Sequence, residues 1–477
     1  MTMVSLHQLF STSFVFAAAV LLAGCASRDR PTSRPDAGIA LPSQWVESGA
    51  GTPARISTGW LKTFRDRDLE AHVAEAMAYN RSLGVAAARL QLAHEDAVGA
   101  RARRLPSIGF RGNASRSRDG NGPDEEVTRQ RAAGLSLDAS WELDLWGRLR
   151  HLDRAARADV AGSEADFRAA RLSLAANVAK AWFDFIAAEQ QALLAETTRD
   201  SFLRNQRITE RNYKAGDESA NAFSVQIGRS NVSSAERSLV RARLERSEAA
   251  RDLEVLVGRY PEAAIKGRDQ FPTLPSMIPA GLPSELLSRR PDLVAGAAEL
   301  LASSERADAA RKDLLPSINL NGGPSSSSRS LDRILLDPEY FVWSIAAGLA
   351  QQVYEGGAPT AAARRALVAN EIAVRSFADL CLRAFREVES ALATERSLAM
   401  QENFLDAELK QANLAEAQAA RDYSEGLVDI ISLLEAQRRA VSARIAMINV
   451  RTQRLRNRVD LHLALGGDFA TLPDDRP

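Results

Sequence analysis

Few side chains in this 477-residue chain have the types and spacing that chemistry requires. The five histidines do not cluster in the sequence, and two cysteines are too few for a structural zinc site. The chain has no Gly-x-Ser-x-Gly motif, phosphate-binding loop or metal-ligand cluster. Cys381 lies in a helical pattern, where we expect a buried apolar side chain. The sequence therefore predicts a protein that is not an enzyme and needs no metal or cofactor.

The carboxylates Asp138, Glu142 and Asp144 belong to an alternating pattern rather than to an acid–base pair. Apolar and polar residues alternate without interruption over residues 135–144, which predicts a strand with one apolar and one acidic face. After Gly147 the pattern becomes helical for a long stretch. A strand that leads directly into so long a helix is consistent with a chain that crosses lipid as a β-strand and continues in water as a long helix. The three carboxylates are then expected to line a wet lumen.

The N-terminus carries an apolar run over residues 10–23 that leads to Cys25. The run is too short and too early for a mature membrane span. Leu-Ala-Gly before Cys25 resembles the lipobox of a bacterial lipoprotein, which predicts lipidation of this cysteine, and Ala26 after it favours the outer membrane. No Lys or Arg precedes the run, so the usual positive region is missing. The alternative is an ordinary signal peptide with an incidental cysteine.

The composition narrows the class of protein further. Lys+Arg and Asp+Glu are equal at 61 each, which argues against a nucleic-acid binder. After removal of the N-terminal run, no apolar stretch of about 18 residues remains, so we expect no transmembrane helix. A mature chain that crosses a membrane must then do so as a closed β-barrel, because lipid leaves no other way to satisfy the backbone amides.

The second half of the chain repeats the first. Three pairs of landmarks share one offset of 210 residues: Asn80-Arg-Ser-Leu83 with Arg290-Pro-Asp-Leu293, Leu105-Pro-Ser-Ile108 with Leu315-Pro-Ser-Ile318, and Tyr213-Lys-Ala-Gly216 with Tyr423-Ser-Glu-Gly426. A constant offset over three landmarks indicates a duplication. Each half is expected to contain one β-hairpin and two long antiparallel helices.

The expected elements follow from periodicity and breakers. Long helices are predicted over 148–212, 220–257, 361–422 and 430–465. Strands are predicted over 107–118, 135–144 and 341–349, with a charged loop at 119–129 and a Gly/Ser-rich loop at 322–330. The predicted domains are a signal peptide (1–24), an anchored linker (25–59), a first repeat (60–258), an equatorial linker (259–283), a second repeat (284–466) and a tail (467–477).

Four strands cannot close a membrane barrel, and an open sheet edge in lipid leaves unsatisfied amides. The chain must therefore oligomerise, and three copies would give twelve strands. The long helices would continue the tube in water. The predicted fold class is mostly α with a membrane β-barrel contribution, built from an internal duplication.

These features resemble an outer-membrane factor of the TolC-like family, in its lipoprotein, NodT/OprM-like branch. The resemblance rests on the lipobox at Cys25, the three repeated landmarks, Glu142-Leu-Asp-Leu-Trp-Gly-Arg148 and Leu433-Leu-Glu-Ala-Gln-Arg438. It implies a trimeric twelve-stranded β-barrel (four strands per chain), continued by a long α-helical periplasmic barrel. It also implies that this homotrimer is the passive exit duct of an RND-type tripartite efflux pump for drugs or other small molecules. The implied partners are outer-membrane lipid, a periplasmic adaptor and an inner-membrane RND-type transporter.

The resemblance also implies a periplasmic gate. Glu435 stands at the family's gate-acid position, twelve residues after Tyr423, and Arg438 follows one helical turn later. With Asp429, these residues are predicted to form the closed-state lock, in which three copies of Glu435 make a carboxylate ring. Ser432 replaces a second acid found in some relatives, so a single ring is expected. The alternative is an ordinary solvated helix pair.

The hairpin ends carry the remaining predicted sites. Tyr213, Gly216, Tyr423 and Gly426 mark the two turns, where glycine suits a left-handed helix cap. The resemblance adds adaptor docking at these tips. Two other functions stay open: the duct of a type I protein-secretion system, and a lipid-anchored structural coiled coil, which would leave the apolar strand face without burial.

Overall fold

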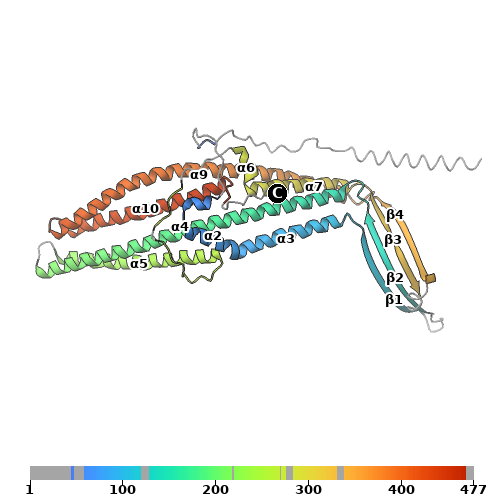
Figure 1. Cartoon of the computed structure of the whole chain (residues 1–477), viewed down its shortest axis with the longest axis horizontal. Helices are drawn as coiled ribbons and strands as arrows, with labels where there is room; N and C mark the ends of the chain where they lie inside the picture. Colours follow the sequence, from blue (N-terminus) through green and yellow to red (C-terminus); the bar gives the residue numbers. More distant parts are fainter. Residues whose placement is uncertain are drawn as a thin grey trace, which may run out of the picture. The chain divides into compact units, whose positions relative to one another are not determined.

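The computed structural model describes residues 45–47, 59–119, 128–216, 220–268, 270–275, 283–329 and 338–468 (Figure 1). All the elements below belong to one unit, Ile39–Pro477. The signal peptide, Cys25 and most of the anchored linker, the equatorial linker's residues 276–282 and the end of the tail lie outside the described residues.

Long helices dominate both halves of the chain. The first half contains η1 (Trp60–Phe64), α2 (Arg67–Tyr79), α3 (Arg81–Ala102), α4 (Arg148–Ala215) and α5 (Ala222–Val257). The second half contains α6 (Pro283–Arg289), α7 (Pro291–Lys312), η2 (Pro338–Tyr340), α9 (Ala358–Ser424) and α10 (Ile430–Ala464). The four long helices agree with the predicted ranges to within about three residues at each end. Within the described residues, no helix is long and apolar enough to cross a membrane.

One antiparallel sheet has the order β1-β2-β3-β4. Its strands are β1 (Ser107–Asp119), β2 (Thr128–Glu142), β3 (Ser317–Ser328) and β4 (Phe341–Ala350). Ser107 pairs with Ser140 in the first hairpin, and Ser317 pairs with Ala350 in the second, so both members of the pair shift by the same 210 residues. The predicted duplication is therefore confirmed at the level of strand register.

Three predicted boundaries in the sheet are wrong. The strand predicted to begin at residue 135 begins at Thr128, within the predicted charged loop 119–129. The Gly/Ser-rich segment 322–330 is not a loop, because β3 continues to Ser328. Ladders to β2 and β4 on both sides override the weak strand propensity of Gly and Ser. Gly323 has φ 156°, and a Cβ there would lie 1.8 Å from the carbonyl oxygen of Leu137, so only glycine fits this close approach.

The predicted strand 135–144 also ends early, at Glu142. The carboxylate of Asp144 instead accepts hydrogen bonds from the backbone N–H groups of Leu149 (2.9 Å) and Arg150 (2.8 Å). These N–H groups lie in the first turn of α4 and have no partner within the helix. Asp144 therefore caps the long helix rather than extending the strand.

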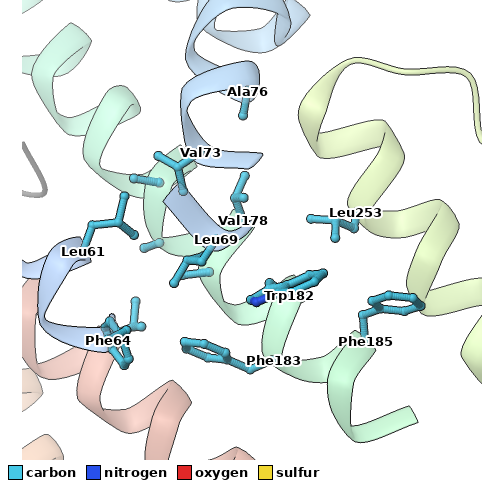
Figure 2. Packing of buried hydrophobic residues seen from close by; sticks show 14 of the residues in the cluster. Leu61, Phe64, Leu69, Val73, Ala76, Val178, Trp182, Phe183, Phe185 and Leu253 are labelled. Carbon is cyan, nitrogen blue, oxygen red and sulfur yellow. The ribbon is translucent and has the colours of Figure 1, made fainter. Parts of the chain in front are cut away.

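The largest core cluster lies where η1, α2, α4 and α5 meet (Figure 2). Trp182, Phe183 and Phe185 of α4 pack there with Phe64 and other buried residues. Within this cluster the buried carboxylate of Asp66 caps α2 and accepts a hydrogen bond from Trp182 Nε1 (3.0 Å). A second cluster contains Cys381, which is 1% exposed, so the prediction of a buried apolar role for this cysteine is confirmed.

Candidate functional site

The apolar face of the sheet is exposed. Ile108, Phe110, Trp343 and Leu349 are each about 70% accessible, although such side chains are normally buried. Strand pairing places them on one face, with Ile318 opposite Leu349 on the same side. Strands β1 and β4 each have one edge without a pairing strand in the described part of the chain. A large exposed apolar face between two open edges requires lipid or further copies to cover it.

The opposite face carries the predicted lumen carboxylates, and the structure gives them different surroundings. Asp138 is exposed on β2 and accepts a hydrogen bond from the Ser136 hydroxyl (3.0 Å). Glu142 binds Arg148 through both carboxylate oxygens (2.8 Å each). Asp144 caps α4, as described above. Glu142 and Asp144 therefore fix the turn from β2 into α4, and lumen lining stays a prediction for all three.

Two further residues hold this turn, and the sequence alone did not indicate them. Trp146 Nε1 donates to the carbonyl oxygen of Pro316 (2.6 Å), and Lys312 Nζ donates to the carbonyl oxygen of Trp146 (2.6 Å). Both contacts link the first repeat to the second across more than 160 residues of sequence. These hydrogen bonds join the segment between β2 and α4 to the segment between α7 and β3.

The two hairpin ends are equivalent in backbone and different in side-chain contacts. Gly216 and Gly426 both adopt φ 76°, the left-handed conformation that ends α4 and follows α9. Tyr213 is 48% exposed, whereas Tyr423 is 6% exposed. The hydroxyl of Tyr423 makes a hydrogen bond with Thr209 Oγ1 on α4 (2.7 Å). Only the second tip is therefore tied to the neighbouring hairpin through its tyrosine.

Glu435 and Arg438 pair as their spacing suggests. Arg438 Nη2 lies 2.5 Å from Glu435 Oε2, and Arg439, which the sequence analysis missed, places Nε 2.9 Å from Oε1. Both arginines lie on α10, at the i+3 and i+4 positions that could have identified them. These hydrogen bonds, that from Arg438 first, hold the pKa of Glu435 below its usual range. Glu435 therefore stays ionised, and its negative charge is balanced by two arginines of its own helix.

Asp429 does not join this pair. Its carboxylate caps α10 by accepting a hydrogen bond from the backbone N–H of Ser432 (2.8 Å), which lowers the pKa of Asp429. Ser432 is thus part of the helix cap. The structure brings Glu435 and Arg438 together and gives Asp429 a separate role.

The contacts between hairpins join residues whose pairing the sequence analysis did not predict. The side-chain amide of Gln437 on α10, 4% exposed, accepts from Asn205 Nδ2 (3.1 Å) and donates to Ser201 Oγ (3.0 Å), both on α4. Around it, Leu433 and Leu434 of α10 pack in a small apolar cluster with residues of α4. Together with the Thr209–Tyr423 hydrogen bond, these contacts join α4 to α9 and α10 near the tips.

Comparison with known proteins identifies the family to which this chain belongs. The model of the outer membrane efflux protein family matches residues 73–259 and 282–467, one segment in each repeat. The pyoverdine export outer membrane protein OpmQ of Pseudomonas aeruginosa is 30% identical over 464 residues, which cover 95% of this chain and 96% of OpmQ. The probable outer membrane lipoprotein SilC of Salmonella typhimurium is 28% identical over 473 residues, or 97% of this chain and 99% of SilC.

The fold agrees with that of a solved channel. The structure of the outer-membrane channel OprN superposes with a TM-score of 0.83 at 26% identity and covers 92% of this chain and 99% of OprN. The chain belongs to the outer membrane efflux protein family. The predicted family, fold class, outer-membrane location and role as an efflux exit channel are thereby confirmed. The family is one of channels rather than of enzymes.

Proposed function

We propose that three copies of this chain close into one passive duct that conducts small molecules from the periplasm to the exterior. The observation that carries this proposal is the four-stranded sheet, which has two open edges and one exposed apolar face. An open edge in lipid leaves unpaired amides, and the smallest membrane barrels need about eight strands. Pairing β4 of one copy with β1 of the next gives about twelve strands and leaves no edge.

The duct works as the exit of a tripartite pump. A periplasmic adaptor docks at the hairpin tips marked by Tyr213, Gly216, Tyr423 and Gly426, and an inner-membrane RND-type transporter supplies the energy. OpmQ is named for pyoverdine export, which favours small molecules over proteins as the cargo of this chain. Energy supplied elsewhere is consistent with a family of channels that need no catalytic site.

The N-terminus anchors the duct. Cys25, which follows a signal peptide at 1–24, carries the lipid, and SilC is named an outer membrane lipoprotein. The linker 25–59 leads from the anchor to the first repeat (60–258), and the equatorial linker (259–283) leads to the second (284–466), before the tail (467–477). Glu435, Arg438 and Asp429 stand near the periplasmic end as the gate, with Glu435 as the carboxylate ring. The carboxylates Asp138, Glu142 and Asp144 face the aqueous path.

The test is the assembly of the mature protein extracted from outer membranes in mild detergent. Native mass should give a trimer, and the trimer should conduct ions in planar bilayers. Trp343→Lys places a charge on the apolar face, where it costs about 2–4 kcal/mol per chain in lipid, and should prevent a stable trimer.

Ser344→Lys is the matched control, because the next residue of β4 lies on the opposite face and its charge should be tolerated in water. A soluble monomer, a dimer, or equal trimer yields for the two variants would contradict the proposed duct. A soluble monomer would instead support the lipid-anchored coiled coil.

A further inference from the structure

The apolar face of the first hairpin changes character towards its loop. From the helix side outward, the residue pairs on this face are Ile108–Ala139, Phe110–Leu137, Gly112–Leu135, Ala114–Ala133, Arg116–Arg131 and Arg118–Arg129. The side chains of Arg116, Arg118 and Arg131 are exposed, and we call these three residues the outer arginine group.

The outer arginine group is electrostatically unfavourable by itself. Arg116 and Arg131 stand directly opposite each other on adjacent strands, an arrangement that destabilises a sheet when the charges are alike. Within the described residues, Arg116, Arg118 and Arg131 have no carboxylate in ion-pair contact. Some exposed arginines elsewhere do have one, as Arg241 does with Glu245 at 2.9 Å. The group therefore lacks a counter-charge that an external anion could supply.

The cations lie on one face and in one repeat only. On the opposite face of the same strands, the pairs at this height are Ser115–Ala132, Ser117–Gln130 and Asp119–Thr128, and none of them contains a cation. In the second hairpin, the positions 210 residues after Arg116, Arg118 and Arg131 are Ser326, Ser328 and Phe341. The repeated fold thus does not require the arginines, and the absence of cations from these pairs on the opposite face indicates that the arginines do not serve the aqueous path.

The position of the group selects the class of anion. Arg116 follows Ile108 by eight residues, or about 26 Å along the strand, which at a strand tilt of about 40° is roughly 20 Å of height and lies near the outer end of the ~25 Å apolar band of a membrane barrel. The other ends of the strands lead into the long helices. The orientation rests on the proposed duct: with the helices in the periplasm, the arginines lie at the outer leaflet.

We propose that the outer arginine group binds the phosphorylated head group of the outer-leaflet glycolipid, through the phosphates of lipid A. Guanidinium groups donate two parallel hydrogen bonds to a phosphate, and a cluster of them neutralises a doubly charged head group. The acyl chains of the same lipid cover Phe110 and Leu137 below the arginines, so one ligand satisfies both parts of the face. The lipid is thereby held to one hairpin of each copy.

The binding test uses the full mature trimer in mild detergent. Bisphosphorylated lipid A and the same glycolipid without phosphates are titrated separately, and bound lipid is counted by native mass spectrometry. The wild type should prefer the bisphosphorylated form. The double variant Arg116→Gln/Arg131→Gln should weaken its binding by roughly tenfold or more, because two charge-assisted contacts are lost.

The controls use the same strands. Arg111→Gln removes an arginine from the opposite face of β1, where it pairs with Ser136, and should leave lipid binding unchanged. Arg116→Lys/Arg131→Lys keeps the charges and should retain more binding than the glutamine variant. Equal binding by the wild type and Arg116→Gln/Arg131→Gln, or no preference for the phosphorylated lipid, would overturn the proposal.

The loop of this hairpin offers a competing set of anions, because its sequence contains Asp124, Glu125 and Glu126, which lie outside the described residues. If only the variant D124N/E125Q/E126Q binds lipid A, the loop occupies the arginines and the proposal fails. Conductance in phospholipid bilayers without lipid A tests the duct independently. Absence of lipid A binding by the wild-type trimer, with intact conductance, therefore contradicts this inference and leaves the duct unaffected.

Discussion

Phe185 on α4 and Glu395 on α9 occupy equivalent positions in the two repeats, 210 residues apart, and both are buried. Phe185 packs among aromatic side chains in the largest core cluster (Figure 2). Glu395 instead lies between Arg454 (2.9 Å) and Arg458 (2.7 Å) of α10. The same helix position is thus filled once by apolar packing and once by a buried ion-pair network. The duplicated backbone does not dictate the chemistry of its core.

The difference extends to the helix ends that follow. Glu254 and His462 each lie four residues before a left-handed glycine, Gly258 or Gly466, and both are about 1–2% exposed. Glu254 accepts backbone hydrogen bonds from residues 263–265 at 2.6–3.2 Å. His462 stacks on Trp60 with ring centroids 5.4 Å apart, and in the described structure neither of its ring nitrogens has a hydrogen-bond partner. A buried charge in the first repeat corresponds to a buried neutral ring in the second.

The largest effect is expected from removing the buried charge of the second repeat. Glu395→Gln removes the charge of the carboxylate that binds Arg458, which is 1% exposed, and should lower the free energy of unfolding by about 3–5 kcal/mol. Glu402→Gln is the matched control, because Glu402 also pairs with Arg454 and is more exposed. The midpoint of thermal unfolding in detergent measures both. A larger loss for Glu402→Gln than for Glu395→Gln would contradict the role assigned to the network.

The next effect concerns pH. Burial, with a smaller contribution from the charge of Arg458, lowers the pKa of His462 to about 3, so this ring is neutral in the folded protein. The unfolded chain takes up the proton at the ordinary value of 6.5, so the folded state loses stability as the pH falls from 6.5 towards 3. The slope from this group approaches about 1.4 kcal/mol per pH unit.

The variant His462→Phe keeps the stack on Trp60 and removes the titrating group. Its unfolding midpoint should therefore fall less steeply between pH 6 and pH 4 than that of the wild type. His94→Phe, at an exposed position of α3, should keep the wild-type slope. Identical slopes for His462→Phe and the wild type would show that this ring does not couple folding to protons.

The sequence predicted the repeated framework well, because the signals for its hairpins and long helices can be read from the order of the residues alone. Alternation in residues 135–144 and the constant offset of 210 residues identify hairpins and long helices without knowledge of contacts. The prediction of a loop at 322–330 was wrong, because the strand there is stabilised by hydrogen bonds to the two neighbouring strands and not by the propensity of its own residues.

At the candidate gate, too, contacts within one helix were predictable from the sequence and contacts between helices were not. The Glu435–Arg438 pair was predictable because both residues lie within one helical turn. The contacts of Gln437 with α4 join residues 232 and 236 positions apart, and no pattern in a single sequence indicates such partners. Contacts inside α10 thus followed from spacing, whereas contacts between hairpins required the structure.

The smallest effect tests the comparison between the two hairpin tips. Tyr423→Phe removes the hydrogen bond to Thr209 and should weaken the link between α9 and α4 by about 0.5–1.5 kcal/mol. If this link helps to hold the channel closed, single-channel recordings of Tyr423→Phe should show a higher open fraction than the wild type. Tyr213→Phe, at the equivalent and exposed position, should leave the open fraction unchanged.

Thr209→Val removes the other partner of the same hydrogen bond and keeps the shape of the side chain. It should raise the open fraction as Tyr423→Phe does, and the double variant should add little, because both changes break one interaction. Equal open fractions for Tyr423→Phe and Tyr213→Phe would show that the tips function alike in spite of their different contacts. An open fraction that responds to Glu435→Ala and not to Tyr423→Phe would instead assign the closed state to the carboxylate ring on α10.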